Sequence, residues 1–225
     1  MFSCMTSMAS EPQLHVAPAA ARTGAGAAAA APPVALIDRS DEDLMVASAA
    51  GHRDAFEVLV ARYLPRLTSY CAKLTRDARA AEDLAQDTLL ALWQSRGRYR
   101  PEHGFRVLAF TIALNRCRNH ARSWRRRLRW LGIADQPEDT GATALRDPVH
   151  LDQLLELERQ RHVRAALARL PHQACAVLLL RFEQELSYAE IAQIVGRREA
   201  TVRSQVFHAL RRLACVLEEE SDDLP

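Results

Sequence analysis

Residues 185–213 read ELSYAEIAQIVGRREATVRSQVFHALRRL, and this stretch decides the fold of the second half of the chain. Ser187 and Glu190 have the spacing of a capping box, in which each side chain satisfies a backbone N–H group at a helix start. The box predicts a helix that begins at Tyr188. Gly196 then supplies the left-handed residue that ends a helix. Between them runs an apolar stripe at helical spacing, made of Tyr188, Ile191, Ala192 and Val195.

A second helix is predicted after a short turn. Its expected buried stripe comprises Val202, Val206, Ala209, Leu210 and Leu213. The outward groups can bond phosphates and base edges, and they are Thr201, Arg203, Ser204, Gln205, His208 and Arg212, with Arg197 and Arg198 in the turn. Two helices joined by a tight turn, the second carrying such groups, are the pattern of a helix-turn-helix that contacts duplex DNA.

The composition is typical of a soluble globular protein. The 225 residues, 48% of them hydrophobic, suffice for one large or two small domains. No apolar run approaches the roughly 18 residues that span a bilayer, and the Ala-rich start lacks the features of a secretory signal, so we expect a cytoplasmic protein with no membrane partner. The five cysteines are scattered, which argues against a disulfide framework or a zinc site. We expect no metal and no other cofactor.

The first half of the chain is predicted to be an extension followed by a helical domain. Residues 1–37 are Ala/Pro-rich, and we expect them to be disordered because they have few large apolar side chains to offset the entropy of ordering. Residues 38–130 form the first predicted domain. Its expected helices cover about 41–50, 54–74 and 78–93, and a long helix starts at Phe105.

The second half begins with a predicted linker. Residues 131–150 are polar and punctuated by Gly and Pro, which is typical of a flexible connection. Residues 151–217 form the second predicted domain, with Pro171 opening a helix and Phe182 in its core stripe, and residues 218–225 are an acidic tail. The sequence therefore predicts an all-α protein of two small helical domains joined by a flexible linker.

The predicted helix at 78–93 has a mixed outward face. Ala81, Leu84, Ala85, Thr88 and Leu92 share the inward side, which leaves Asp83, Gln86, Asp87 and Leu90 outward. On charge alone, the two aspartates indicate an ordinary solvated face. The apolar Leu90 beside them indicates a protein partner instead.

Arginine is concentrated after that helix. Arg96, Arg98 and Arg100 surround Tyr99 in an aperiodic loop over 94–104, and the next helix adds Arg116, Arg118, Arg122, Arg125, Arg126, Arg127 and Arg129. The formal net charge of +2 conceals this block. A bias in the coding DNA would spread arginine evenly, whereas here only Glu102 opposes the arginines between positions 96 and 129. Such a block with aromatic residues suits a phosphate backbone and unstacked bases.

Taken together, these motifs resemble the bacterial RNA polymerase sigma factors of the sigma-70 family, in its extracytoplasmic function (ECF) subfamily. AEDLAQDTLLALW at 81–93 and FRVLAFTIALNRCRN from Phe105 are similar to the family's region 2. LARLPHQACAVLLLRFEQELSYAEIAQIVGRREATVRSQVFHAL from Leu167 is similar to region 4. The resemblance assigns region 2 to residues 38–130 and region 4 to residues 151–217.

The resemblance implies a non-enzymatic protein that binds core RNA polymerase and directs promoter-specific initiation. Contacts to the polymerase clamp helices of the largest subunit are implied for Asp83, Gln86, Asp87 and Leu90, with the flap as a second contact. Contacts to the separated minus-10 strand are implied for Arg96, Arg98, Tyr99, Arg100, Phe105, Asn115, Asn119 and Arg122. The helix-turn-helix residues Arg197, Arg198, Thr201, Arg203, Ser204, Gln205, His208 and Arg212 would face the minus-35 duplex. An anti-sigma factor stays open as a further partner, and the free protein is expected to be monomeric.

Some positions depart from the family pattern. Leu108, Asn119 and Leu89 replace residues that the family usually has there, and they are expected to be packing variants. Ala200, Gln205 and Leu210 replace the usual glycine and arginines of the recognition helix, so the upstream sequence preference stays open.

Two other functions are compatible with parts of the sequence. A stand-alone helix-turn-helix regulator would explain residues 187–213 but not the arginines around Tyr99. An enzyme acting on DNA would need a nucleophile or paired carboxylates with a base, for which the sequence offers no candidate. A single recognition helix discriminates by roughly 1–3 kcal/mol per base contact. Two modest contacts held by a large partner gain through effective concentration, which favours the sigma-factor interpretation.

Overall fold

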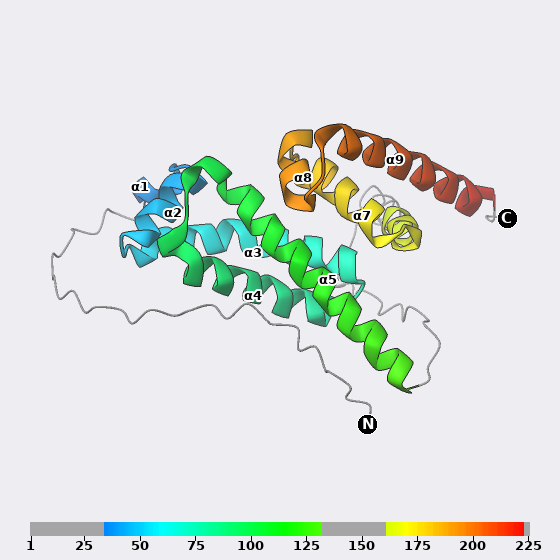
Figure 1. The fold of residues 1–225 in the computed structure, drawn as a ribbon, viewed down its shortest axis with the longest axis horizontal. Coiled ribbons are helices and arrows are strands. Elements are labelled where there is room, and N and C mark those ends of the chain that lie inside the picture. The colour runs from blue at the N-terminus through cyan, green and yellow to red at the C-terminus, as the bar shows by residue number, and fades with distance from the viewer. Residues whose placement is uncertain (1–33, 132–160, 223–225) are drawn as a thin grey trace, which may run out of the picture. The chain divides into compact units, whose positions relative to one another are not determined.

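The computed structural model describes residues 34–131 and 161–222, and every regular element in these ranges is helical (Figure 1). The predicted all-α class is therefore confirmed. The predicted N-terminal extension and linker lie almost entirely outside the described residues, so their structure stays a prediction. The described residues belong to one compact unit of the chain.

The first part of the fold is a helical bundle around α3. Its helices are α1 (Val34–Ile37), α2 (Asp41–Ala49), α3 (Arg53–Thr75), α4 (Ala78–Ser95) and α5 (Phe105–Leu131). Aromatic side chains of α3 and α5 meet edge to face in the core: Tyr63 contacts Phe105 with ring centroids 4.8 Å apart, and Tyr70 contacts Phe110 at 5.4 Å. All four rings are fully buried, so this seam between α3 and α5 forms the centre of the bundle.

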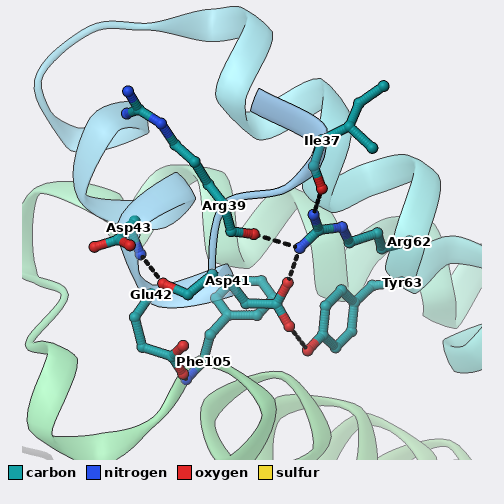
Figure 2. A network of polar contacts seen from close by, with 9 residues as sticks. Ile37, Arg39, Asp41, Glu42, Asp43, Arg62, Tyr63 and Phe105 are labelled. Atoms are coloured by element: carbon teal, nitrogen blue, oxygen red, sulfur yellow. Dashed lines mark hydrogen bonds and ion pairs between the residues drawn. The ribbon is translucent and has the colours of Figure 1, made fainter. Parts of the chain in front are cut away.

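A polar network fixes the chain ahead of α2 against α3 (Figure 2). The Arg62 guanidinium donates hydrogen bonds to the carbonyl oxygens of Ile37 and Arg39 and, at 2.6 Å, to Asp41 Oδ1. The other carboxylate oxygen of Asp41 accepts a hydrogen bond from the Tyr63 hydroxyl. One carboxylate thus satisfies both a half-buried arginine and a buried phenol, which a neutral residue at position 41 could not do.

The second part of the fold contains the helix-turn-helix. After a helix over 161–169 come α7 (His172–Leu178), a π-helical turn at Leu179–Glu183, α8 (Tyr188–Val195) and α9 (Glu199–Asp222). Pro171 precedes α7 as its N-cap, one position earlier than predicted. The buried side chains of this part include Val177, Leu180, Leu186, Ile191, Val202 and Val206.

Two residues predicted to be buried here are exposed. Phe182 is 58% exposed because the π turn holds one extra residue, which rotates it off the stripe that α7 begins. Leu210 is 40% exposed. At 100° per residue it lies about 70° from the centre of the stripe that Val202, Val206 and Ala209 form, at its edge rather than within it.

The π turn contacts α3 through a cluster of polar side chains. Glu183 Oε1 accepts a hydrogen bond from Ser69 Oγ at 2.6 Å and lies 2.9 Å from Lys73 Nζ. The neighbouring Gln184 is almost fully buried, and its Oε1 accepts a hydrogen bond from Arg66 Nε at 2.9 Å. Acceptors of the π turn therefore meet three donors on one face of α3.

Candidate nucleic-acid interface

The outward face of α4 is as the sequence predicts. Asp83, Gln86, Asp87 and Leu90 are all exposed, and Leu90 is 52% exposed despite its apolar side chain. The opposite face of the helix is buried in the bundle, with Ala81, Ala85, Thr88, Leu89 and Leu92. The structure therefore brings the four candidate residues together as one surface, which we call the α4 face.

The α4 face lies beside α5. Asp87 Oδ2 accepts a hydrogen bond from Arg116 Nη1 at 3.1 Å, and this ion pair joins the two helices at the surface. On α5, the side chains of Asn115, Asn119 and Arg122 are exposed at positions i, i+4 and i+7, which share one side of a helix. We call this side the strand face of α5.

The loop between α4 and α5 is more ordered than its aperiodic sequence indicates. α4 continues to Ser95, and two short 3-10 turns follow, η1 (Arg96–Arg98) and η2 (Pro101–His103). Arg96 lies over the Trp93 ring at 3.8 Å and donates a hydrogen bond to the Trp93 carbonyl at 2.7 Å. Arg96 is therefore engaged with its own helix, whereas Arg98 and Arg100 are exposed.

Phe105 is placed differently from the prediction. Its side chain is fully buried and packs edge to face on both Tyr63 and Tyr99, so it supports the loop from behind instead of contacting DNA. An aromatic residue after a loop can stack on a base or fill a core, and its sequence context does not separate the two.

Tyr99 forms a half-buried wall of the loop. Its ring lies 6.4 Å from that of Phe105, and its hydroxyl oxygen is buried without a hydrogen-bond partner. Burial, together with the negative charges of Glu42 and Asp41, raises the pKa of Tyr99 to about 12. The phenol stays neutral at physiological pH, so this wall offers a stacking surface with no charge to repel a phosphate.

Glu42 is a positioning residue that the sequence gave no reason to select. It stands among the acidic residues that open α2, yet its Oε1 accepts a hydrogen bond from the backbone N–H of Phe105 at 2.9 Å. That N–H group begins α5 and has no partner within the helix. The preceding Gly104 has φ +66°, a conformation that favours glycine, so the loop turns sharply into α5 at a fixed point.

The helix-turn-helix confirms its predicted local structure. Ser187 N–H donates to Glu190 Oε2 at 2.7 Å, and Glu190 N–H donates to Ser187 Oγ at 3.2 Å, which completes the capping box. Gly196 ends α8 with φ +68°. The turn and the start of α9 surround an open hollow lined by Ala192, Gln193, Gly196, Arg197, Arg198 and Thr201.

Most of the predicted duplex-reading residues are accessible. The exposed ones are Arg197, Arg198, Thr201, Arg203, Ser204, His208 and Arg212. Gln205 is half-buried, and its Oε1 is buried without a hydrogen-bond partner. Arg203 is not free, because it donates to Glu199 Oε1 at 2.7 Å and lies 5.0 Å from the Tyr188 ring centroid.

Searches for other kinds of site in these residues were negative. Over 34–131 and 161–222, no three His, Cys, Asp or Glu side chains cluster in a way that could hold a metal ion. Within the same ranges, no helix is both long and apolar enough to cross a membrane.

Comparison with known proteins identifies the family. The model described as Sigma-70 region 2 matches residues 59–127, and the model described as Sigma-70, region 4 matches residues 160–213. The chain is 34% identical over 170 residues to RNA polymerase sigma factor CarQ of Myxococcus xanthus, covering 75% of this chain and 92% of CarQ. It is 33% identical over 180 residues to ECF RNA polymerase sigma factor SigL of Mycobacterium tuberculosis, covering 76% of this chain and 94% of SigL. The chain belongs to the ECF group of RNA polymerase sigma factors.

This ECF sigma factor also has a solved structural relative. CnrH, solved in complex with the cytosolic domain of CnrY, superimposes with a TM-score of 0.60 at 23% identity, covering 80% of this chain and 99% of CnrH. At that identity the likeness concerns the fold. As a sigma factor the protein acts in transcription initiation, so the stand-alone regulator is not favoured, and sigma factors are not enzymes.

Proposed function

We propose that this sigma factor works in the cytoplasm as a monomer until it binds core RNA polymerase, and that the α4 face is the surface that docks on the clamp. The α4 face carries two carboxylates beside an exposed leucine, a combination that fits a basic and partly apolar partner. The ion pair between Asp87 and Arg116 carries the proposal. It sets the polymerase-binding surface directly against the strand face of α5, as melting DNA at the polymerase surface requires.

The strand face and the loop would hold the separated minus-10 strand. Asn115, Asn119 and Arg122 provide amide and guanidinium donors along α5, and Arg98 and Arg100 provide charge beside the Tyr99 wall. Extracting a base costs a few kcal/mol, which stacking and polar contacts in a shaped pocket can offset. Phe105 enters this proposal only as the support behind Tyr99, and Arg96 only through its stacking on Trp93.

The exposed face of α9 would contact the minus-35 duplex. Arg197, Arg198 and Thr201 around the hollow suit phosphate contacts, and Arg203, Ser204, Gln205, His208 and Arg212 suit the groove. The likeness to CnrH, which was solved with the cytosolic domain of CnrY, supports an anti-sigma factor as a further partner. The polymerase flap is proposed as the contact of the second domain.

The docking proposal is tested by reversing charge on the α4 face. Asp83→Arg with Asp87→Arg should abolish binding to core polymerase, measured by fluorescence anisotropy of labelled protein, while circular dichroism shows an intact fold. Glu82→Arg is the matched control, since it reverses an exposed acid of the same helix outside the α4 face. Equal binding by the double variant and the control would show that the α4 face is only solvated surface.

The whole function is tested by run-off transcription on a library of genomic promoter fragments. Holoenzyme reconstituted with the wild-type chain should transcribe a restricted set of fragments that core enzyme alone does not. Failure to bind core enzyme, together with no specific transcript, would overturn the proposal.

A further inference from the structure

The last turns of α5 leave the bundle. The helix is buried at Ala113, Leu114 and Cys117, but every side chain described from Arg122 to Trp130 is exposed. Figure 1 shows this end of α5 running past α3 and α4. A helix rises 1.5 Å per residue, so Trp130 lies about 12 Å along the axis beyond Arg122.

The exposed end continues the strand face. At 100° per residue, five side chains fall within about 80° of one another on a single side of α5: Asn115, Asn119, Arg122, Arg126 and Trp130. The buried stripe that contains Cys117 lies on the opposite side. Arg126 and Trp130 thus extend the proposed strand-binding track by two helical turns, without a change of face.

Trp130 is not an extension of the core. It is 90% exposed, and it lies about 140° around the helix from Cys117. Trp124 is different, because it lies within about 20° of Cys117 and is only 47% exposed, as a residue at the end of the core stripe would be. A fully exposed tryptophan on a polar face indicates a binding role, since large apolar side chains rarely stand alone in water.

The charge of this end selects the kind of ligand. α5 contains eight arginines and no Asp or Glu, and six of the arginines follow Cys117. Like charges spaced along one helix repel each other, so the end is stabilised by a polyanion laid against it. A tryptophan with arginines one turn away is the combination that stacks bases and holds phosphates of single-stranded nucleic acid.

We propose that Trp130 and Arg126 form an additional site for single-stranded DNA, which holds the part of the separated strand that runs beyond the minus-10 element. Trp130 stacks on a base, and Arg126 contacts a backbone phosphate. This inference rests on the proposed function, because it extends the strand face. It predicts that the protein holds a longer stretch of open strand than Asn115, Asn119 and Arg122 alone could reach.

The test uses holoenzyme and single strands from a promoter that it transcribes in the run-off assay. One oligonucleotide stops at the ends of the minus-10 element, and others are extended on one side or the other. Trp130→Ala should weaken binding of one extended strand about five-fold or more, as loss of a stacked base does, and leave the short strand unaffected. Trp130→Phe should restore most of the affinity because a ring is kept, and Arg126→Ala should lower the salt dependence.

The controls separate this inference from its foundation. Trp124→Ala removes a tryptophan two turns away from the core side and should leave both affinities unchanged. Equal affinity of wild type and Trp130→Ala for every extended strand would overturn the inference alone, whereas failure of wild-type holoenzyme to bind any strand would overturn the proposed function. Vesicles of phosphatidylglycerol test the other polyanion, and a Trp130-dependent response to vesicles without one to DNA would assign the site to lipid headgroups.

Discussion

Glu42 caps a helix that begins 63 positions later in the chain, since its Oε1 accepts a hydrogen bond from the backbone N–H of Phe105 at 2.9 Å. The bond joins the first turn of α2 to the point where the arginine loop enters α5. The negative carboxylate is also favourably placed at the positive end of the α5 dipole. Through Phe105, it holds the support on which Tyr99 packs.

Removing this cap should destabilise the protein. Glu42→Ala is expected to lower the free energy of unfolding by about 1 kcal/mol, the usual cost of losing a helix cap, and Glu42→Gln by less because an acceptor is kept. Urea denaturation followed by circular dichroism measures the change. Asp43→Ala removes an exposed acid from the same turn and serves as control. If both alanine variants lose the same stability, the cap has no special role.

The salt bridge between Glu199 and Arg203 should limit DNA binding. Arg203 must exchange Glu199 for a phosphate or a base, so Glu199→Gln is expected to raise duplex affinity about two-fold, the value of an exposed helical ion pair. Arg203→Ala should weaken binding and flatten its dependence on salt. Anisotropy titrations of holoenzyme on promoter duplex at several salt concentrations measure both effects.

Glu57→Gln is the matched control for this prediction. It breaks an exposed pair of the same i, i+4 type, between Arg53 and Glu57 at 3.2 Å on α3, and changes the net charge equally. An equal gain in affinity for both variants would indicate a general charge effect instead of release of Arg203.

Three tyrosines should make the fold sensitive to alkali. Burial raises the pKa of Tyr63 and of Tyr70 well above 10, and that of Tyr99 to about 12. The native protein keeps protons that the unfolded chain releases near pH 10, so the stability they contribute is complete below pH 10 and is lost as pH rises from 10 towards 12 and above. Each retained proton steepens this fall by up to about 1.4 kcal/mol per pH unit.

Tyr70→Phe tests the alkaline effect. The Tyr70 hydroxyl is buried without a hydrogen-bond partner, so the variant should be as stable as wild type or slightly more stable at pH 7. Between pH 10 and 12 its stability should fall less steeply. Urea denaturation at a series of pH values gives the slopes, and an unchanged slope would contradict the assignment.

The cysteines should differ strongly in reactivity. Cys215 is exposed, whereas Cys71, Cys117 and Cys175 are buried. The hydrogen bond with Cys71 and burial together raise the pKa of the Cys117 thiol, and burial raises that of Cys175 to about 11. Because the thiolate is the reactive form, iodoacetamide should modify Cys215 first and the three buried thiols only in urea. Mass spectrometry of the peptides would show the order, and early labelling of Cys117 would contradict it.

The parts of the fold that depend on local sequence were predictable. The capping box of Ser187 and Glu190 and the left-handed Gly196 are determined by neighbours within four residues, and the structure confirms all three. Phe182 was not predictable, because a helical stripe assumes a constant turn and the π turn changes the register. The bonds from Glu42 and Arg62 join residues more than twenty positions apart, and no periodic pattern encodes such pairs.

The candidate site divides in the same way. Periodicity on α4 correctly predicts that Asp83, Gln86, Asp87 and Leu90 are exposed together, because one side of the helix packs against the bundle. Residue type alone could not reveal that Phe105 is a core side chain or that Arg96 stacks on Trp93. Those placements depend on how the loop folds back, which is decided by Glu42 and Gly104.

The π turn at Leu179–Glu183 gives this sigma factor a means of inherited variation in how α8 and α9 are aimed. Losing one residue there would restore an ordinary α-helical turn and rotate everything that follows by about 100° relative to α7. A gain or loss of a single codon could therefore redirect the recognition helix in one step, with no substitution in the helix itself. Descendants of one ancestral gene could thus differ in promoter geometry while keeping identical reading residues.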